Sequence, residues 1–71
     1  MSKDHADLRA RIRSLAATMP AGAADWPQHR AAQFKIDLRA AHRAADHPMA
    51  GRWVLEQALR NLERYHEPQS A

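Results

Sequence analysis

The segment from residue 47 to residue 66 has the clearest helical pattern in this chain, and any fold has to cover its apolar face. The members of that face are Val54, Leu55, Ala58, Leu59, Leu62 and Tyr65. Pro48 suits the first position of a helix, because its missing N–H would have no partner there anyway. Asp46 or His47 can flank it as the cap. The pattern therefore predicts a helix over 48–66.

Two earlier segments show the same periodicity. The apolar stripe of the first consists of Leu8, Ile12, Leu15 and Met19. The stripe of the second consists of Ala31, Phe34, Leu38, Ala41 and Ala45. Between them, Pro20 and Gly22 are typical of a helix end and a connector, and Pro27 suits the start of the next helix. We therefore predict helices near 3–18 and 27–45.

Each of these two helices is preceded by residues that suit a helix start. Ser2 or Asp4 can cap the first helix, and Asp25 can cap the second, because their side-chain oxygens accept hydrogen bonds from unpaired backbone N–H groups. Trp26 follows Asp25 and is predicted to fold over the helix junction as a hydrophobic staple, with ligand binding as the alternative.

The length of the chain limits the core. At 71 residues it forms one domain, and a domain of this size buries only about 60% of the surface that its unfolded chain exposes. About half of the hydrophobic residues are Ala, which favours helix but adds little apolar area. We predict an all-α fold, a small three-helix bundle, as a single domain over 1–71 with frayed ends at about 1–3 and 67–71. Self-association into a homodimer would enlarge the thin core and is also expected.

Composition narrows the functional class. The absence of cysteine removes both a disulfide framework and a thiolate zinc site. No apolar run approaches the roughly 20 residues of a membrane span, and the N-terminus is too charged for a secretory signal. We expect a soluble, cytoplasmic protein without a membrane partner. The net charge of +3 is only mildly basic.

No residue pattern points to catalysis. His42 and Asp46 are four residues apart on one helix face, but no third metal ligand has a predictable position, and Arg39 and Arg43 would repel a cation. The serines and Thr18 lack a neighbouring histidine and acid of the kind that a nucleophilic site requires. We therefore predict no metal, no cofactor, no small-molecule substrate and no enzymatic activity.

The second helix carries an additional apolar line beside its main stripe. This line consists of Ala32, Ile36, Ala40 and Ala44. Two apolar sides indicate either that this helix lies between the other two or that its extra face meets a partner. Ile36 is the largest member of the line and is a predicted interface residue.

Basic residues accompany both of the first two helices. Lys35, Arg39 and Arg43 recur at i, i+4 and i+8 and form the most coherent basic row in the chain. Like charges at this spacing repel, so a phosphate backbone or an acidic partner would relieve them, although a hydrated row is the simpler alternative. Arg9 and Arg13 on the first helix are interpreted as a solvated face.

The last helix carries a second apolar spot. Met49 and Trp53 lie four residues apart and point away from its main stripe. With Arg60 and Arg64 they form the mixture of Met, aromatic and Arg residues that is enriched at protein interfaces. The alternative is that Trp53 closes the end of the bundle, near Trp26.

Together these patterns predict a small, non-enzymatic regulatory binding protein that acts through protein contacts. Its partner is a second copy of itself, a larger protein complex, or both. The alternative function is binding of a DNA or RNA backbone by the basic row of the second helix.

Overall fold

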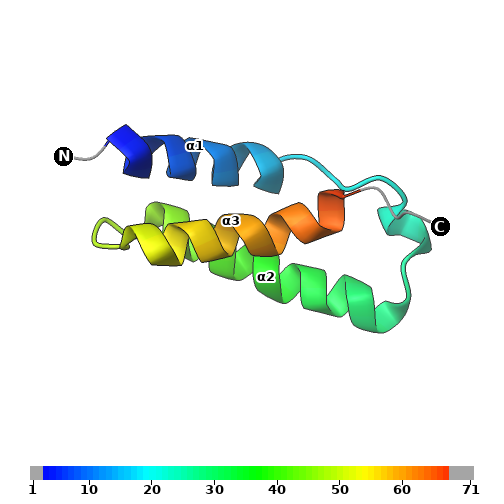
Figure 1. Cartoon of the computed structure of the whole chain (residues 1–71). Coiled ribbons are helices and arrows are strands. Elements are labelled where there is room, and N and C mark those ends of the chain that lie inside the picture. Colours follow the sequence, from blue (N-terminus) through cyan, green and yellow to red (C-terminus); the bar gives the residue numbers. More distant parts are fainter. Residues whose placement is uncertain (1–2, 68–71) are drawn as a thin grey trace.

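All three predicted helical segments form helices. The computed structural model describes residues 3–67, with side chains from residue 5 onward. In this range the chain forms α1 (Lys3–Ala16), α2 (Gln28–Asp46) and α3 (Arg52–His66), with a short 3₁₀ helix, η1 (Ala23–Asp25), before α2. Each α-helix packs against the other two, which confirms the predicted three-helix bundle (Figure 1).

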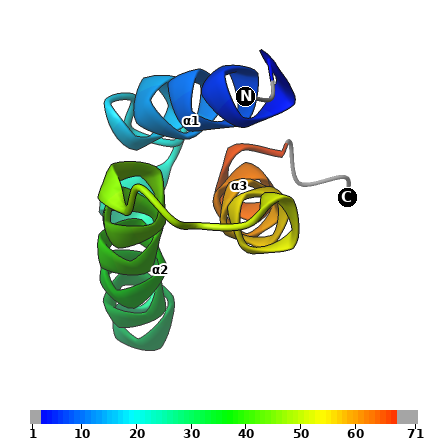
Figure 2. The ribbon, with the colours of Figure 1, turned by 90° about the vertical axis from the view of Figure 1, so that its left-hand side faces the viewer.

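The connections lie at opposite ends of the bundle. α1 and α2 run in opposite directions, as do α2 and α3 (Figure 1). Figure 2 looks along the bundle from the end at which residues 47–51 join α2 to α3, and it shows α1 and α2 crossing α3 obliquely. Each helix therefore turns one face inward and leaves its outer face to solvent.

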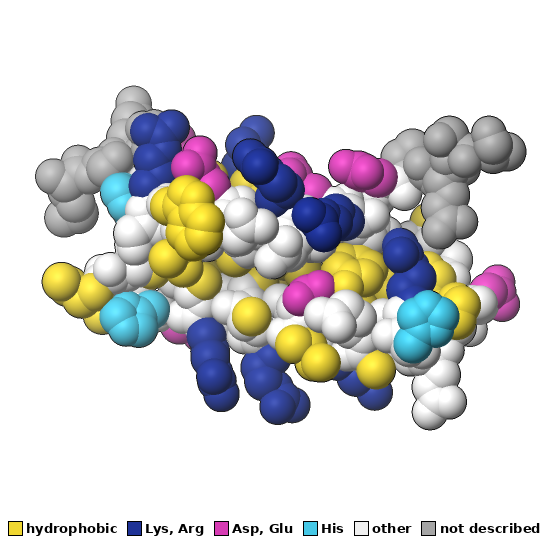
Figure 3. Space-filling view, turned by 60° about the horizontal axis from the view of Figure 1, so that its bottom comes forward, with side chains coloured by type: hydrophobic (Ala, Val, Ile, Leu, Met, Phe, Trp, Pro, Cys, Tyr) yellow, Lys and Arg dark blue, Asp and Glu magenta, His cyan; other side chains and the backbone are white. Residues whose placement is uncertain are grey.

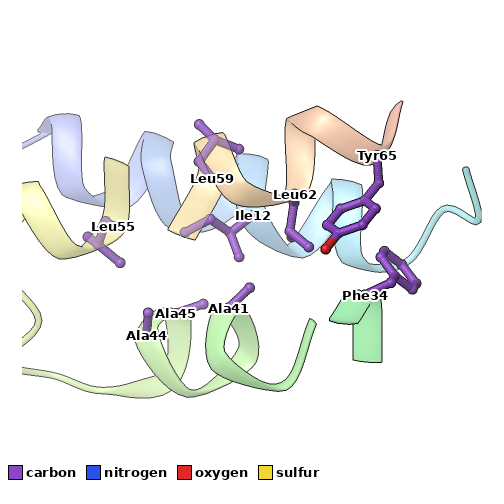
Figure 4. Packing of buried hydrophobic residues seen from close by; sticks show 9 residues of the cluster. All are labelled: Ile12, Phe34, Ala41, Ala44, Ala45, Leu55, Leu59, Leu62 and Tyr65. Carbon is purple, nitrogen blue, oxygen red and sulfur yellow. The ribbon is translucent and has the colours of Figure 1, made fainter. Parts of the chain in front are cut away.

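The core between the helices is small, as the alanine content predicts. α3 supplies Leu55, Leu59, Leu62 and Tyr65, α2 supplies Phe34, Ala41, Ala44 and Ala45, and α1 supplies Ile12. Figure 4 shows these nine side chains gathered between the helices, with Phe34 and Tyr65 at one end. Among the described side chains, the large ones that are completely buried are Ile12, Leu55 and Leu62. The short alanine side chains of α2 allow the other two helices to approach it closely.

The predicted start of the last helix at Pro48 is wrong. Asp46 ends α2, and the chain then makes a turn before α3 begins at Arg52. Inside this turn the Met49 N–H donates to His47 Nδ1 at 3.0 Å, and the Ala50 N–H donates to the His47 carbonyl at 3.2 Å. The His47 carbonyl, which would accept the first hydrogen bond of a helix starting at Pro48, is thus used inside the turn, and the Leu55 N–H donates instead to the Gly51 carbonyl at 3.1 Å. Val54 is consequently in the first turn of α3, and 45% of its side chain is exposed rather than buried in the stripe.

The first connector also differs from the prediction. α1 ends at Ala16 rather than near residue 18, because the Thr18 N–H turns back to the Leu15 carbonyl at 3.1 Å. Met19 therefore lies beyond the helix and is 70% exposed, not part of the core stripe. Asp25 does not cap α2 either, since it belongs to η1 and the N-cap residue makes no side-chain hydrogen bond.

The predictions for the chain ends fall largely outside the described residues. The backbone of α1 is described from Lys3, but the side chains of Ser2 and Asp4, the two predicted caps, are not described. The predicted frayed ends include residues 1–2 and 68–71, which also lie outside the described range. At the other end of α3, the last helical residue is His66, as predicted.

Candidate functional site

The outer side of α2 is open to solvent. Because α1 and α3 pack directly against each other, α2 does not lie between them, and that explanation of its second apolar line is wrong. Ala32 and Ala40 are exposed, and Ile36 is 62% exposed. Only Ala44 of this line is buried. Over Ala32, Ile36 and Ala40 the helix thus presents an apolar surface that no other part of the described chain covers.

Three members of this line, Ile36, Ala40 and Ala44, line two hollows on the surface. One hollow of about 360 Å³ is lined by Lys35, Ile36, Arg39, Ala40 and Arg43. A second hollow of about 470 Å³ lies between α2 and the start of α3, and its lining includes Ala40, Arg43, Ala44, Met49 and Val54. Ala40 and Arg43 line both hollows, so the two are adjacent. We call this surface the α2 groove.

The basic row forms one wall of the α2 groove. Lys35, Arg39 and Arg43 are all exposed, and none of their side chains has a hydrogen bond or ion pair with another described residue. Figure 3 shows Lys and Arg side chains along one edge of this face, next to hydrophobic side chains. Asp37 lies between them in sequence, but its carboxylate accepts hydrogen bonds from Gln33 at 3.3 Å and from the Tyr65 hydroxyl at 2.6 Å. Asp37 therefore forms no ion pair with the row.

The structure divides the predicted interface residues between two surfaces. Ile36 and Met49 both line the α2 groove, and Met49 is 83% exposed. Trp53, Arg60 and Arg64 are spaced at i, i+7 and i+11 on α3, so they share one helix face, and all three are exposed. Since α3 begins after Met49, the prediction that Met49 and Trp53 share a helix face is wrong.

Trp53 does not close the bundle. Its side chain is 73% exposed and it lies in the first turn of α3. Trp26 packs at the other end of α3, where its ring centroid lies 5.5 Å from that of Tyr65 and 5.4 Å from that of Phe34. Trp26 therefore covers the start of α2, as predicted, whereas the predicted alternative that Trp53 packs near it is wrong.

The aromatic end also contains the one group in the described chain whose pKa is clearly shifted. Burial, followed by the hydrogen bond to Asp37, raises the pKa of Tyr65 to about 12. The Arg30 guanidinium lies over both neighbouring rings, 4.6 Å from the centroid of Trp26 and 5.1 Å from that of Tyr65. The hydrogen bond between Tyr65 and Asp37 joins α3 to α2 at this end.

A hollow of about 550 Å³ opens beside these rings. Arg30 and His66 line it, and each has one nitrogen, Nε and Nε2 respectively, that is buried without a hydrogen-bond partner in the described part of the chain. Neighbouring atoms cover both nitrogens, so neither offers a donor to a ligand in the hollow. The α2 groove is the better candidate for a binding surface.

Sequence reasoning missed the role of two arginines. Arg9 and Arg13 were expected to be solvated, but both reach across to the end of α2. Arg9 Nη2 donates to the His47 carbonyl at 2.9 Å, and Arg13 Nη2 donates to the Ala45 carbonyl and to Asp46 Oδ1, each at 3.1 Å. Cations satisfy the unpaired carbonyls at a helix C-terminus. They hold the turn that carries Met49, and only the antiparallel arrangement of α1 and α2 reveals this role.

The metal and membrane predictions can be compared with the described residues only. Among them, no three histidine, aspartate or glutamate side chains are grouped so that they could hold a metal ion. Asp46, one of the two candidate ligands, is paired with Arg13. No helix within residues 3–67 is both long enough and apolar enough to cross a membrane.

Comparison with known proteins adds no relative. The chain matches no family model, and neither the curated proteins nor the solved structures gave a match. Functional inference for this chain therefore begins from its own surface.

Proposed function

We propose that this chain is a small, non-enzymatic regulatory protein that binds other proteins, and that the α2 groove is its contact surface. The supporting observation is the placement of large apolar side chains. Of the five such side chains that are exposed in the described chain, Ile36, Met49 and Val54 line this one groove. Contiguous exposed apolar surface bordered by polar groups is typical of protein contact sites.

The bundle does not need these three side chains for its own packing. None belongs to the buried core cluster, and the loop that carries Met49 is held by polar contacts from Arg9 and Arg13. Covering apolar surface stabilises a complex by about 25 cal/mol per Å² of area removed from water. A partner that covers Ile36, Met49 and Val54 gains this energy without any rearrangement of the core.

Affinity capture with matched variants tests this proposal. Met49→Ser and Val54→Ser each remove an apolar side chain from the groove, whereas Met19→Ser removes another exposed methionine, from the first connector. We expect the two groove variants to lose a protein that the wild type and Met19→Ser both retain, with unchanged circular dichroism. Equal capture by all four proteins would show that the groove is not the contact surface.

Trp53→Ala separates the groove from the outer face of α3. Loss of capture in Trp53→Ala alone would move the contact surface to Trp53, Arg60 and Arg64. Loss in the groove variants alone supports the α2 groove. Loss in Met19→Ser as well would point to a general effect of surface apolarity.

The unpaired basic row favours a second candidate function. Lys35, Arg39 and Arg43 have no described partner, and three cations at one-turn intervals suit contact with a nucleic-acid backbone. If this is the function, a variant with all three residues changed to Gln will bind duplex DNA or RNA more weakly and with a smaller salt dependence. Absence of wild-type binding at low salt would exclude it.

A further inference from the structure

We infer that the α2 groove binds an acidic amphipathic helix of a different protein. The helix lies along α2 with its apolar side on Ile36, Met49 and Val54, and its carboxylates face Lys35, Arg39 and Arg43. This inference rests on the proposed function and adds the chemical nature of the partner. It is carried by the shape of the groove and by its charge.

The shape of the groove suits a helix. Ala40 and Ala44 form its floor, and their short side chains let another backbone come close. Ile36, Ala40 and Ala44 follow the i, i+4 row of α2, and such rows form the ridges and grooves along which helices pack. The basic row spans about two helical turns, or roughly 12 Å at 1.5 Å per residue. An occupant of two to three turns would cover it.

The charge of the groove selects an acidic occupant. Its basic wall has one cation per turn, and carboxylates spaced four residues apart on a second helix have the same interval. Neither of the nearest described acids forms an ion pair with this wall, because the Asp37 carboxylate faces the Tyr65 hydroxyl and Asp46 is paired with Arg13. Complementary charges increase the association rate and fix the register of a complex.

The same surface is less well matched by two other occupants. A nucleic-acid backbone would pair with the basic wall but would leave Ile36, Met49 and Val54 exposed. A second copy packed antiparallel through its own α2 would bring the two basic walls together on the same side of the interface. Each arrangement leaves either the apolar side chains or the basic wall of the groove without a complementary partner. An acidic amphipathic helix complements both.

The test uses a designed probe. It is a labelled helical peptide of about 18 residues, with a Leu stripe and with Glu at successive i, i+4 positions along one edge of that stripe; a second peptide has Lys in place of each Glu. Fluorescence anisotropy measures binding to the full chain at low and at physiological salt. We expect the Glu peptide to bind, its affinity to fall as salt rises, and the Lys peptide not to bind.

Variants assign the binding to the groove. Changing Lys35, Arg39 and Arg43 together to Gln is expected to lower the affinity for the Glu peptide about tenfold, since each exposed ion pair contributes only a modest free energy. Met49→Ser is expected to lower this affinity about fivefold, because the apolar contact made by the methionine is removed. Met19→Ser, also exposed but outside the groove, should leave binding unchanged. Circular dichroism melts of every variant confirm that each is folded.

Four outcomes would overturn the inference. They are failure of the Glu peptide to bind, equal binding of the Lys peptide, tighter binding of duplex DNA that depends on the same three cations, and a groove-dependent dimer in sedimentation equilibrium at tens of micromolar. Failure of the peptide together with groove-dependent capture of a cellular protein would reject the acidic helix while leaving the proposed function intact. Capture that is insensitive to the groove variants would reject the proposed function itself.

Discussion

The two ends of this bundle are closed in different ways. At the end where α1 is connected to α2, Trp26, Phe34 and Tyr65 pack against one another with ring centroids 5.0–5.5 Å apart. At the end where α2 is connected to α3, the turn is held by hydrogen bonds from Arg9 and Arg13, and its largest apolar side chain points into solvent. One end is closed by apolar packing and the other by polar capping.

Because of this difference, the residues that stabilise the fold and the residues that are exposed for binding lie at opposite ends of the bundle. The aromatic end places its large apolar side chains inside, where they contribute to folding. The capped end fixes its backbone with guanidinium groups, so that Met49 and Val54 are left available without being needed for the fold. Substitutions at the first end should therefore change stability, and substitutions at the second should mainly change binding.

The largest effect on stability is expected at the aromatic end. Phe34 is buried and contacts the rings of both Trp26 and Tyr65, so Phe34→Ala should lower the free energy of unfolding by about 3–5 kcal/mol. A chain of this size has a total stability of similar magnitude, so the variant should be largely unfolded at 25 °C. Urea denaturation followed by circular dichroism measures the change.

Trp53→Ala is the matched control for this substitution. It removes a larger aromatic ring, but one that is exposed, so the expected change is within about 0.5 kcal/mol. If the two substitutions lower the free energy of unfolding equally, the contrast between the two ends is wrong and Trp53 contributes to the core.

The next effect concerns the ionisation of Tyr65. Its pKa is raised to about 12 in the folded chain, from 10.0 for an unperturbed tyrosine. The folded state then holds the Tyr65 proton more tightly than the unfolded state does. The contribution of this proton to the free energy of unfolding is therefore complete below pH 10 and is lost as the pH rises through 12. The loss should reach about 2 kcal/mol by the upper end of this window.

Thermal melts of the wild type and Tyr65→Phe between pH 8 and pH 12 isolate this contribution from other titrating groups. Tyr65→Phe lacks the hydrogen bond to Asp37 and should be less stable by about 1 kcal/mol at pH 8. Its disadvantage should disappear and then reverse as the wild-type hydroxyl ionises, because the wild type alone loses about 2 kcal/mol over this range. A constant difference across the range would show that folding does not raise the pKa of Tyr65.

At the capped end, a smaller effect is expected from Arg13. Arg13→Gln removes the cation that donates to the Ala45 carbonyl and pairs with Asp46, but the pair is largely exposed, so the expected loss is about 1 kcal/mol. Arg11→Gln removes a charge from the same helix at a residue without a described hydrogen bond or ion pair, and its expected effect is close to zero. Equal effects would mean that net charge, not capping, is responsible. Chemical denaturation at low and high salt distinguishes the two.

Much of the fold could be predicted from helical periodicity alone. The stripe with Phe34 and Ala41 in α2 and the stripe with Leu55 and Leu62 in α3 are buried as expected, because a 3.6-residue repeat determines which side of a helix can face a core. The alanine-rich sequence also indicated the small core correctly.

Helix ends and long-range contacts could not be predicted in the same way. Pro48 carries a valid start signal, but hydrogen bonds within the turn and from Arg9 stabilise a later start. The α2 groove was only partly predictable, because its lining also depends on long-range packing. Periodicity identified Ile36 and the basic row, whereas the inclusion of Val54 in the groove depends on how α3 packs beside α2.

The smallest predicted effect tests where α3 begins. Gly51 is its N-cap residue, with φ −75° and ψ 163°. Because glycine has no side chain, α3 lacks a side-chain cap at its start. Gly51→Ser keeps a backbone conformation that serine adopts readily and adds a hydroxyl that can accept from the first turn, so stability should rise by about 0.5–1 kcal/mol. The same substitution at Gly22, whose φ is +75°, should lower stability by about 1 kcal/mol. Urea denaturation of both variants should therefore give shifts of opposite sign. A loss of stability in Gly51→Ser would instead indicate that α3 begins nearer to Pro48 and that the turn carrying Met49 is helical.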